Sequence, residues 1–368
     1  VVDVLRHQGR QARAELAEHT TLSNQALATI LNDLVQSGYV LEVETHGARR
    51  GRGRPALLYE YNAERQCVLS LYVGLRYSEV SLCDGLGRTV ADNIEFSPGW
   101  DADRVVSEAA SHIDSLLGAS RVDREQCHIG IVVHGWVDTR AGTATSTDMG
   151  WDGVPIAHLL ADATGLDVTV HEASRAAAIA EYRQGAAAGA HRAMVFNVGP
   201  EITATQVTDG VLDTGSGGFA GMVGKCQVPD ADGRLTPIDS LIGSFVSKRR
   251  YTEMSGKHVD WMTDVYRLAR RGDPIAREVL EMSIDVIGYA ASWLVTITNP
   301  ERLVLTGAMG DYDDDHKSKL LARIVELTDP RMLHECSIHF SSLARQAWIR
   351  GGVHAALDEQ RRSDPLTG

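Results

Sequence analysis

The sequence lacks several features that define common protein classes. Its 368 residues contain no apolar run near the roughly 20 residues that a membrane-spanning helix needs, and no secretory leader is recognisable. The five cysteines lie far apart, without the paired spacing of a disulfide framework or a zinc knuckle; they occupy positions 67, 83, 127, 226 and 336. We therefore expect a cytoplasmic protein without a membrane span, a disulfide scaffold or a local zinc site.

The sequence also has fewer basic residues than acidic residues. The chain has 36 lysines and arginines against 49 aspartates and glutamates, a net charge of −13. Residues 1–60 nevertheless contain seven arginines and seven acidic residues. This first segment is therefore neutral, and the rest of the chain carries the whole negative charge. With 43% hydrophobic and 23% charged residues, the composition is that of a folded protein with two or three domains.

Residues 22–38 contain the clearest local pattern. Apolar residues recur there with helical spacing, which predicts an amphipathic helix that Ser23 caps and Gly38 ends. The predicted buried stripe consists of Leu27, Ile30, Leu31, Leu34 and Val35. The opposite face is short and mostly polar, and such side chains can hydrogen-bond to base edges in a DNA major groove. It consists of Asn24, Gln25, Ala28, Thr29 and Asn32.

The segments around this helix predict a winged helix-turn-helix. Apolar stripes at 1–5 and 14–17 indicate two further helices, and a turn at 18–22 precedes the third. Strand-like runs at 38–44 and 57–61 enclose a polar loop. That loop contains Arg49, Arg50, Arg52 and Arg54. Arginines among glycines suit an extended wing in a minor groove. The alternative is a helical cap on an enzyme, with a solvated arginine loop.

The rest of the chain contains one order of elements twice. An antiparallel meander is predicted at 67–91, with its third strand at 88–91, before a helix at 103–119. A second meander is predicted at 192–212. This internal repeat implies two similar α/β lobes facing a cleft.

Several of these segments resemble the ROK family (repressors, open reading frames, kinases). The run from Arg13 to the Gly-Arg-Gly-Arg-Pro-Ala sequence at 51–56 looks like the winged helix of its repressors, and Asn299-Pro-Glu301 matches a strand beside its purine site. The resemblance covers residues 1–356 and implies an α/β protein with a winged helix-turn-helix followed by a two-lobed, actin-like (ribonuclease H-like, hexokinase-like) nucleotide-binding fold. The expected divisions are a DNA-binding domain at 1–64, lobe 1 at 65–186, lobe 2 at 187–356 with a C-terminal helix returning to lobe 1, and a tail at 357–368.

The sequence departs from the family pattern at both phosphate-binding loops. The first loop should read close to Asp-x-Gly-Gly-Thr, but residues 72–77 read Tyr-Val-Gly-Leu-Arg-Tyr. The second should read close to Gly-Thr-Gly-Ile-Gly, but residues 199–203 read Gly-Pro-Glu-Ile-Thr. Pro200 removes a backbone donor, and Glu201 adds negative charge where phosphate would lie. We therefore expect no ATP binding, no cofactor and no enzymatic activity.

The metal position is altered as well. Residues 221–225 read Gly-Met-Val-Gly-Lys where the family has Gly-Glu-x-Gly-His, so the metal-binding histidine is missing. Tetrahedral zinc needs four ligands, and Cys226 is the only cysteine near this segment. No metal site is therefore expected. Were zinc present, His171, Cys226 and Asp239 would be the ligands to test.

The resemblance also implies an effector site. Glu172 stands where the family has a catalytic aspartate, and its alternative role is to bind the N-terminus of the next helix. With Asp148 and Asp239, it would contact a sugar-like ligand rich in hydroxyls or carrying positive charge. Trp136 and Trp151 would either stack on a ring of the ligand or belong to the core.

These expectations combine into one predicted function. We expect a DNA-binding transcriptional regulator, with repression as its mode, that forms a homodimer or a dimer of dimers on an inverted repeat in double-stranded DNA. Ser23, Asn24, Gln25 and Thr29 of the helix and the four wing arginines would contact DNA. The alternative is a sugar kinase with a helical N-terminal extension.

Overall fold

The computed structural model describes residues 1–44, 57–120, 122–230 and 232–363. The chain divides into two compact units, unit 1 from Val1–His171 with Gly352–Gly368, and unit 2 from Glu172–Gly351. The sequence-based division instead sets the boundary after residue 186 and separates a tail at 357–368. In the structure the last helix, α13 (Gln346–Ser363), continues through much of that tail.

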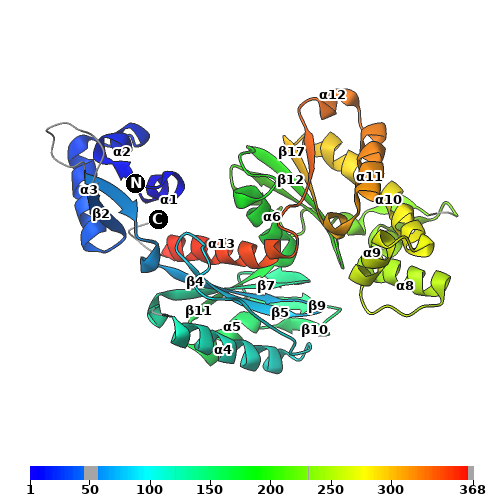
Figure 1. The fold of residues 1–368 in the computed structure, drawn as a ribbon, viewed down its shortest axis with the longest axis horizontal. Helices are drawn as coiled ribbons and strands as arrows, with labels where there is room; N and C mark the ends of the chain where they lie inside the picture. The colour runs from blue at the N-terminus through cyan, green and yellow to red at the C-terminus, as the bar shows by residue number, and fades with distance from the viewer. Residues whose placement is uncertain (45–56, 121, 231, 364–368) are drawn as a thin grey trace. The chain divides into compact units, whose positions relative to one another are not determined.

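Three helices and a small antiparallel sheet form the N-terminal part of unit 1 (Figure 1). The helices are α1 (Val2–Gln8), α2 (Arg13–His19) and α3 (Asn24–Gln36). The strands β1 (Gln11–Ala12), β2 (Val40–Glu44) and β3 (Leu57–Tyr61) pair in the order β1-β3-β2. Leu16, Leu27 and Leu31 are buried in their shared core. The predicted winged helix-turn-helix is confirmed, with β1 as an added strand too short to leave a sequence pattern.

A five-stranded sheet forms the body of unit 1, in the order β11-β7-β4-β5-β6. Its strands are β4 (Cys67–Val73), β5 (Ser78–Asp84), β6 (Ile94–Phe96), β7 (Cys127–Val133) and β11 (Asp167–Glu172). Helices α4 (Ala102–Ala119) and α5 (Ile156–Thr164) contribute to its core, and a small sheet follows β7. That sheet comprises β8 (Trp136–Asp138), β9 (Thr143–Ser146) and β10 (Trp151–Val154).

The predicted third strand of this meander is misplaced. Residues 88–91 contribute only an isolated bridge between Cys83 and Thr89, and the strand is β6, at Ile94–Phe96. The carboxylate of Asp84 accepts hydrogen bonds from the backbone N–H groups of Leu86 and Arg88, at 2.9 and 3.0 Å. These bonds prolong the turn, so the chain returns to the sheet later than its apolar pattern indicates.

Unit 2 repeats the same arrangement, with the sheet order β14-β13-β12-β17-β18. In each unit the central strand pairs antiparallel with the next strand and parallel with a later one. The strands are β12 (Arg192–Val198), β13 (Ile202–Thr208), β14 (Val211–Asp213), β17 (Arg302–Gly307) and β18 (Ser337–Phe340), besides the hairpin of β15 (Gln227–Pro229) and β16 (Leu235–Pro237). The predicted internal repeat is therefore confirmed.

Helices contribute most of the remaining core of unit 2. They are α6 (Ala173–Gln184), α7 (Asp239–Ile242), α8 (Ser244–Ser255), α9 (Met262–Arg270), α10 (Pro274–Thr298), α11 (Asp314–Leu327) and α12 (Pro330–Leu333). Helix α10 has the length and apolar composition of a candidate membrane span. Its residues Val279, Leu280 and Ile287 are buried in the apolar core of unit 2, which is the environment of a core helix in a folded domain.

A disulfide joins Cys67 to Cys127 in unit 1, with 4.9 Å between their Cα atoms. The expectation that the cysteines form no disulfide is wrong for this pair. The two residues are separated by 60 positions in sequence, but they lie opposite each other in the parallel pairing of β4 and β7. Cys83, Cys226 and Cys336 are outside this disulfide and keep their thiols.

Helix α13 approaches the sheet of unit 1 closely at two glycines. A Cβ atom on Gly130 would lie 2.6 Å from the carbonyl oxygen of Gly352, and a Cβ atom on Gly352 would lie 2.2 Å from Ser70 Oγ. The helix can therefore rest on β4 and β7 only because both positions lack a side chain.

We expect Gly130→Ala to lower the free energy of unfolding by about 1–3 kcal/mol, because the new methyl group meets rigid backbone in a packed interface. Gly118→Ala is the matched control. Gly118 lies in α4, where an added Cβ atom would meet no other atom within 4 Å, and alanine there should stabilise the helix by about 0.5–1 kcal/mol. Thermal and denaturant unfolding of both variants would measure the difference. Equal stability of the two would contradict the close packing of α13.

Candidate nucleic-acid interface and effector site

The exposed face of α3 carries the residues predicted to read DNA. Ser23 Oγ accepts a hydrogen bond from the backbone N–H of Ala26 at 3.2 Å, so Ser23 is the helix cap. Asn24, Gln25 and Thr29 are exposed. The Thr29 hydroxyl donates to the carbonyl of Gln25 at 3.2 Å, which leaves its methyl group and lone pairs for an outside partner. The face is therefore polar, uncharged and without bulky side chains at its N-terminal end.

Arg13 is a candidate that the sequence analysis did not include among the site residues. Its guanidinium group donates a hydrogen bond to the carbonyl oxygen of Asn24 and so links α2 to the start of α3. Arg13 is exposed, and a cation beside the N-terminus of a recognition helix is well placed for a phosphate contact. Arg49, Arg50, Arg52 and Arg54 lie outside the described residues, so their role stays a prediction.

The turn after β4 corresponds to the first phosphate loop and is filled by protein atoms. The ring of Tyr72 is buried, and a Cβ atom on Gly74 would lie 2.5 Å from it. The backbone N–H of Gly74 donates to the carbonyl of Tyr77 at 3.1 Å. The Tyr72 hydroxyl is 2.9 Å from Nε2 of buried His134. A phosphate group would have to displace an aromatic ring and compete for a donor that is already used.

The turn after β12 corresponds to the second phosphate loop and is closed in a similar way. The backbone N–H of Gly199 donates to the carbonyl of Glu201 at 3.2 Å, and the N–H of Ile202 donates to Asp239 Oδ1 at 3.2 Å. Pro200, between them, has no N–H group. The side-chain amide of Asn197 also donates to the Glu201 carbonyl, at 3.2 Å. Two N–H groups of this turn, those of Gly199 and Ile202, are therefore already bonded to protein oxygens.

Glu172 caps the N-terminus of α6. Its Oε1 accepts from the backbone N–H of Ser174 at 2.8 Å, and its Oε2 accepts from the N–H of Arg175 at 3.1 Å. The Ser174 hydroxyl lies 2.7 and 2.6 Å from the two carboxylate oxygens. Burial raises the pKa of Glu172, and the bonds from Ser174 and Arg175 oppose that rise. Glu172 therefore has the alternative role expected from the sequence, which is to bind the N-terminus of the next helix. Its contact with an effector stays a prediction.

Asp239 also has local partners. Its Oδ1 accepts from Ile202, and its Oδ2 lies 3.0 Å from Nζ of Lys225. A Cβ atom on Gly224 would lie 1.8 Å from Asp239 Oδ1, so the carboxylate packs directly on the segment that contains Lys225. Lys225, at the position where the family pattern has a histidine, thus supplies a positive charge to the carboxylate of Asp239.

A hairpin stands where the resemblance implies the zinc-binding cysteines. The carboxylate of Asp230, between β15 and β16, accepts from the backbone N–H groups of Asp232 and Arg234, both at 2.9 Å. It also accepts from the Thr236 hydroxyl at 3.2 Å. The backbone bond from Arg234 is the main cause of the lowered pKa of Asp230. Three hydrogen bonds to one carboxylate hold this turn without a metal ligand.

Asp148 lies in unit 1, whereas Glu172 and Asp239 lie in unit 2. Asp148 is exposed in the turn between β9 and β10, and partial desolvation raises the pKa of its carboxyl group. Trp151 is buried and donates its indole N–H to the carbonyl of Trp100 at 2.6 Å, so it belongs to the core. Trp136 is 47% exposed, so part of its ring surface is accessible to a ligand ring.

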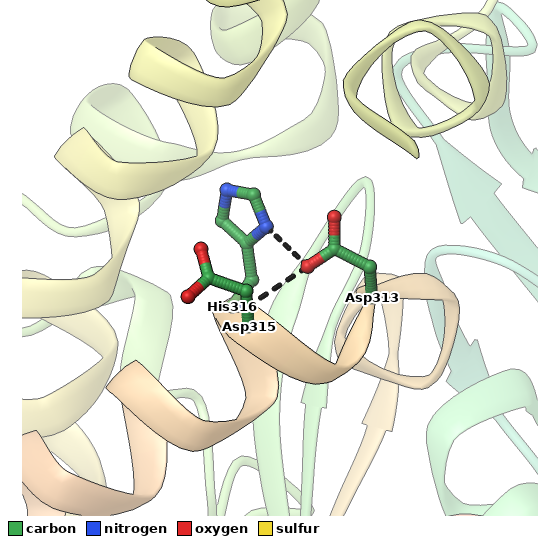
Figure 2. A group of neighbouring side chains, drawn as sticks. All are labelled: Asp313, Asp315 and His316. Atoms are coloured by element: carbon green, nitrogen blue, oxygen red, sulfur yellow. Dashed lines mark hydrogen bonds and ion pairs between the residues drawn. The ribbon is translucent and has the colours of Figure 1, made fainter. Parts of the chain in front are cut away.

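One cluster in unit 2 has a composition that can bind metal. Figure 2 shows Asp313, Asp315 and His316, whose possible ligand atoms lie within 4.8 Å of one another. Asp313 Oδ1 accepts from the backbone N–H of His316 at 2.9 Å and lies 2.6 Å from its Nδ1. Burial acts to raise the pKa of Asp313, but these two bonds lower it overall. The carboxylate is thus already used as the cap of α11.

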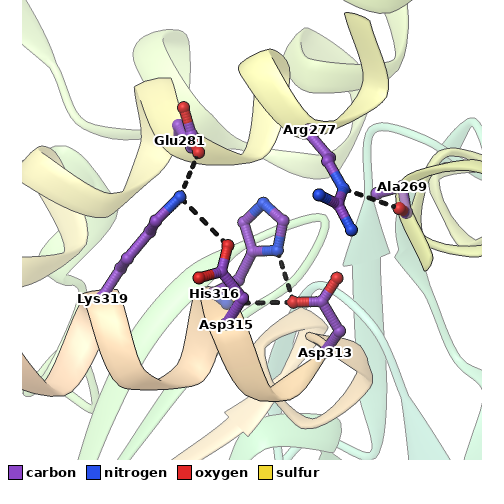
Figure 3. Close-up of polar contacts among 7 residues, drawn as sticks. All are labelled: Ala269, Arg277, Glu281, Asp313, Asp315, His316 and Lys319. Atoms are coloured by element: carbon purple, nitrogen blue, oxygen red, sulfur yellow. Dashed lines mark hydrogen bonds and ion pairs between the residues drawn. The ribbon is translucent and has the colours of Figure 1, made fainter. Parts of the chain in front are cut away.

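The protein's own cations neutralise this cluster. Lys319 Nζ lies 3.0 Å from Asp315 and also pairs with Glu281 of α10, while Arg277 lies beside Asp313 in Figure 3. A helix N-terminus is itself electropositive, which disfavours a metal ion. We assign the cluster to helix packing. The expectation of no bound metal stays a prediction, which elemental analysis of the purified protein would test.

Comparison with known proteins identifies the family. Residues 102–352, more than half of the chain, match the ROK family, and the protein belongs to it. A xylose repressor of Caldicellulosiruptor bescii is 21% identical over 371 residues, covering 95% of this chain and 92% of the relative. A solved ROK family transcriptional regulator, described as a homologue of the Escherichia coli MLC protein, has a TM-score of 0.80 at 21% identity and covers 98% of this chain and 95% of that chain.

Enzymes of the family share the fold over a smaller part of the chain. The ROK hexokinase of Thermus thermophilus has a TM-score of 0.65 at 24% identity and covers 81% of this chain and 100% of that chain. These solved structures establish the actin-like fold of the body.

The buried pair of Tyr72 and His134 should make stability depend on pH. Burial lowers the pKa of His134 from 6.5 to about 4, so the unfolded chain binds the proton more readily than the folded protein. Stability should therefore fall as pH falls from 6.5 toward 4, by about 2 kcal/mol between pH 7 and pH 5. His134→Gln should remove this contribution, whereas His258→Gln, at an exposed histidine, should retain it. Parallel slopes for wild type and His134→Gln in unfolding titrations would refute the assignment.

Proposed function

We propose that the protein is a ROK-family transcriptional repressor whose winged helix-turn-helix binds an inverted repeat in double-stranded DNA. The observation that carries this proposal is the N-terminal fold itself, where α3 presents an exposed polar face ahead of a two-stranded wing. A xylose repressor matches the chain almost end to end. Asn and Gln on such a face can pair with adenine in the major groove, which supports a reading role for Asn24 and Gln25.

Sugar kinase activity is the alternative, and both phosphate turns speak against it. The Tyr72 ring lies against Gly74, and the Gly199 N–H donates within its own turn. Phosphoryl transfer requires available backbone donors at these places, because they hold the charge that develops during transfer. The altered turns and the repressor-like relatives together favour a regulator that has kept the fold without the chemistry.

The wing and the start of α3 supply the expected phosphate contacts. We infer that Arg49, Arg50, Arg52 and Arg54 enter a minor groove, and that Ser23, Thr29 and Arg13 contact the backbone or base edges nearby. The first 60 residues have no net charge, so attraction to DNA depends on these few arginines rather than on a broad basic surface. Their removal should therefore have a large effect.

The apolar surface of α10 supports a dimer. Met282, Tyr289, Trp293 and Ile297, here the α10 stripe, are 43%, 41%, 38% and 79% exposed and recur on one helical face. Neighbouring charges are paired within the unit, as where Arg323 lies 2.8 Å from Asp285 and 5.5 Å over the Tyr289 ring. An apolar stripe flanked by neutralised charge suits a second copy of the same helix across a twofold axis. A dimer of dimers would need a further surface.

An effector is proposed to bind near Glu172 and Asp239 of unit 2. The expected contacts of Asp148 and Trp136, both in unit 1, stay predictions. The xylose repressor among the relatives supports a sugar-like ligand. Glu172 and Asp239 are already bound to backbone N–H groups and, for Asp239, to Lys225. A hydroxyl-rich ligand could donate O–H groups to the remaining lone pairs of these carboxylates without breaking those bonds, whereas a phosphate would be repelled by them.

The double variant Arg52→Ala/Arg54→Ala should bind DNA at least tenfold more weakly, since each good contact contributes about 1–3 kcal/mol. The test is a gel-shift titration at fixed salt on fragments selected from genomic DNA. Gln25→Ala should mainly broaden sequence preference. The control is Arg249→Ala/Arg250→Ala on α8, which removes the same charge from unit 2. Unchanged DNA binding by the wing variant would contradict the role of the wing. ATP turnover that depends on added sugar would instead support the kinase alternative.

Trp293→Glu/Ile297→Glu should convert the dimer to a monomer, because it places four carboxylates in an apolar contact. Light scattering coupled to gel filtration measures the mass, and binding to an inverted repeat should weaken in parallel. Val211→Glu/Leu235→Glu is the control, because these residues are 69% and 67% exposed on other elements of unit 2. If the stripe variant stays dimeric, the two copies must meet elsewhere.

A further inference from the structure

The disulfide between Cys67 and Cys127 lies where the DNA-binding part joins the body. Cys67 is the first residue of β4, which follows the wing strand β3 after a short connection, η1 (Ala63–Arg65) and Gln66. Cys127 is the first residue of β7 and the register partner of Cys67. We propose that this cysteine pair is a reversible redox site whose state sets the affinity of the protein for its operator.

Gln66 connects the disulfide to the core of the winged helix. Its Oε1 accepts from the Tyr61 hydroxyl at 2.6 Å and from the Arg6 guanidinium at 2.8 Å. The same guanidinium lies 4.5 Å over the Tyr61 ring and donates to the Tyr61 hydroxyl at 3.4 Å, so Arg6, Tyr61 and Gln66 form one polar contact between α1, β3 and the residue before β4. Gln66 is buried and is covalently attached to Cys67. A change in the position of Cys67 is therefore passed to α1 and β3 in part through Gln66, beside the backbone bond from Gly85 to the carbonyl of Ala63.

The last helix binds both sides of the same disulfide. Gln360 of α13 donates its amide N–H to the carbonyl of Gln126 at 2.6 Å and lies 3.5 Å from the carbonyl of Cys67. Gln126 directly precedes Cys127 in sequence. Helix α13 and the winged helix are thus both bonded to residues next to the disulfide, which itself joins the first residues of β4 and β7.

The chemistry requires an exchange partner of the thiol class and a local opening of the strand ends, because Cys67 and Cys127 are 2% and 5% exposed. In oxidation, the thiolate of one cysteine attacks an external disulfide such as glutathione disulfide, which forms a mixed disulfide and releases one glutathione thiolate. The thiolate of the second cysteine then attacks the mixed disulfide, so the internal S–S bond forms and the second glutathione thiolate leaves. Reduction is the reverse. Cys83, in the next strand, packs in a separate apolar cluster with Val68 and Val353 instead of with Cys67. The pair can therefore form without competition from that thiol.

The expected effect on DNA binding follows from preorganisation. With the S–S bond present, the starts of β4 and β7 are covalently fixed, and Gln66 holds the winged helix in one orientation. With the bond reduced, strand pairing, apolar packing and hydrogen bonds still hold the junction, but one covalent restraint is lost, so the orientation broadens and must be restricted again when the two winged helices bind two half-sites. We expect the oxidised form to bind about three- to tenfold more tightly. The expected difference in DNA affinity rests on the proposed function, whereas the redox chemistry of the cysteine pair does not.

The test uses the full-length protein, oxidised with glutathione disulfide or reduced with dithiothreitol. Alkylation in denaturant, which exposes the buried cysteines, followed by mass spectrometry should label five thiols in the reduced form and three in the oxidised form, since three of the five cysteines lie outside the disulfide. Gel-shift titration then compares the two forms. Cys67→Ser/Cys127→Ser should bind like the reduced protein and ignore the oxidant. The matched control Cys83→Ser, also buried in this sheet, should keep the full response.

Hydrogen exchange of residues 57–66 gives a readout that does not depend on DNA. It should be faster in the reduced protein and in the double serine variant, and that result supports the junction even if no DNA is bound. Labelling of all five cysteines in both forms would overturn the redox site. A disulfide that forms without changing either DNA affinity or exchange at 57–66 would overturn its coupling to the winged helix. Absent DNA binding in both forms, with a clear exchange difference, would count against the repressor function alone.

Discussion

The parallel pairing of a central strand with a later strand is the constraint on which both units depend. β4 pairs with β7, and β12 pairs with β17, so each central strand is buried between an antiparallel and a parallel neighbour. A parallel partner requires a long crossover, which carries the helices that cover the sheet. The turn after each central strand then lies at the end of its sheet, where the family resemblance implies a phosphate loop. In this protein the N–H groups of Gly74, Gly199 and Ile202 in those turns donate to protein oxygens.

Residues that depart from the family pattern make contacts within the protein at these positions. The Tyr72 ring fills the first turn, Asp239 takes the Ile202 N–H beside the second, and Lys225 gives Asp239 a counter-charge. Asp230 holds its hairpin through two backbone N–H groups and the Thr236 hydroxyl. The bonds to Ile202, to Lys225 and within the Asp230 turn satisfy polar groups that would otherwise be left without a partner, which is a destabilising condition inside a fold. These contacts therefore stabilise the fold where the sequence departs from the family pattern.

The sequence predicted the elements whose pattern lies within one short segment. It did not predict features that depend on side-chain bonds or on partners distant in sequence. The amphipathic spacing around Leu27 was enough to find α3, and the repeated meander was enough to find two lobes. The third strand of the first meander was misplaced because Asp84 prolongs a turn through side-chain bonds that apolar spacing does not report. The Cys67–Cys127 bond was missed because only the pairing of β4 with β7 brings these residues together. The role of Glu172 stayed open because a carboxylate at that position can serve either a helix N-terminus or a ligand.

Because the first 60 residues have no net charge, DNA affinity should depend strongly on how the winged helices are oriented. A single winged helix with few positive charges gains little from counterion release, so one half-site alone should be held weakly. Two such units joined in a dimer bind with an affinity set by their effective concentration at the second half-site, which depends on how well the junction fixes their orientation. In the proposed dimer, a small increase in mobility at Gln66 would therefore weaken binding to the second half-site. Control through the junction then changes the affinity without altering any single DNA contact.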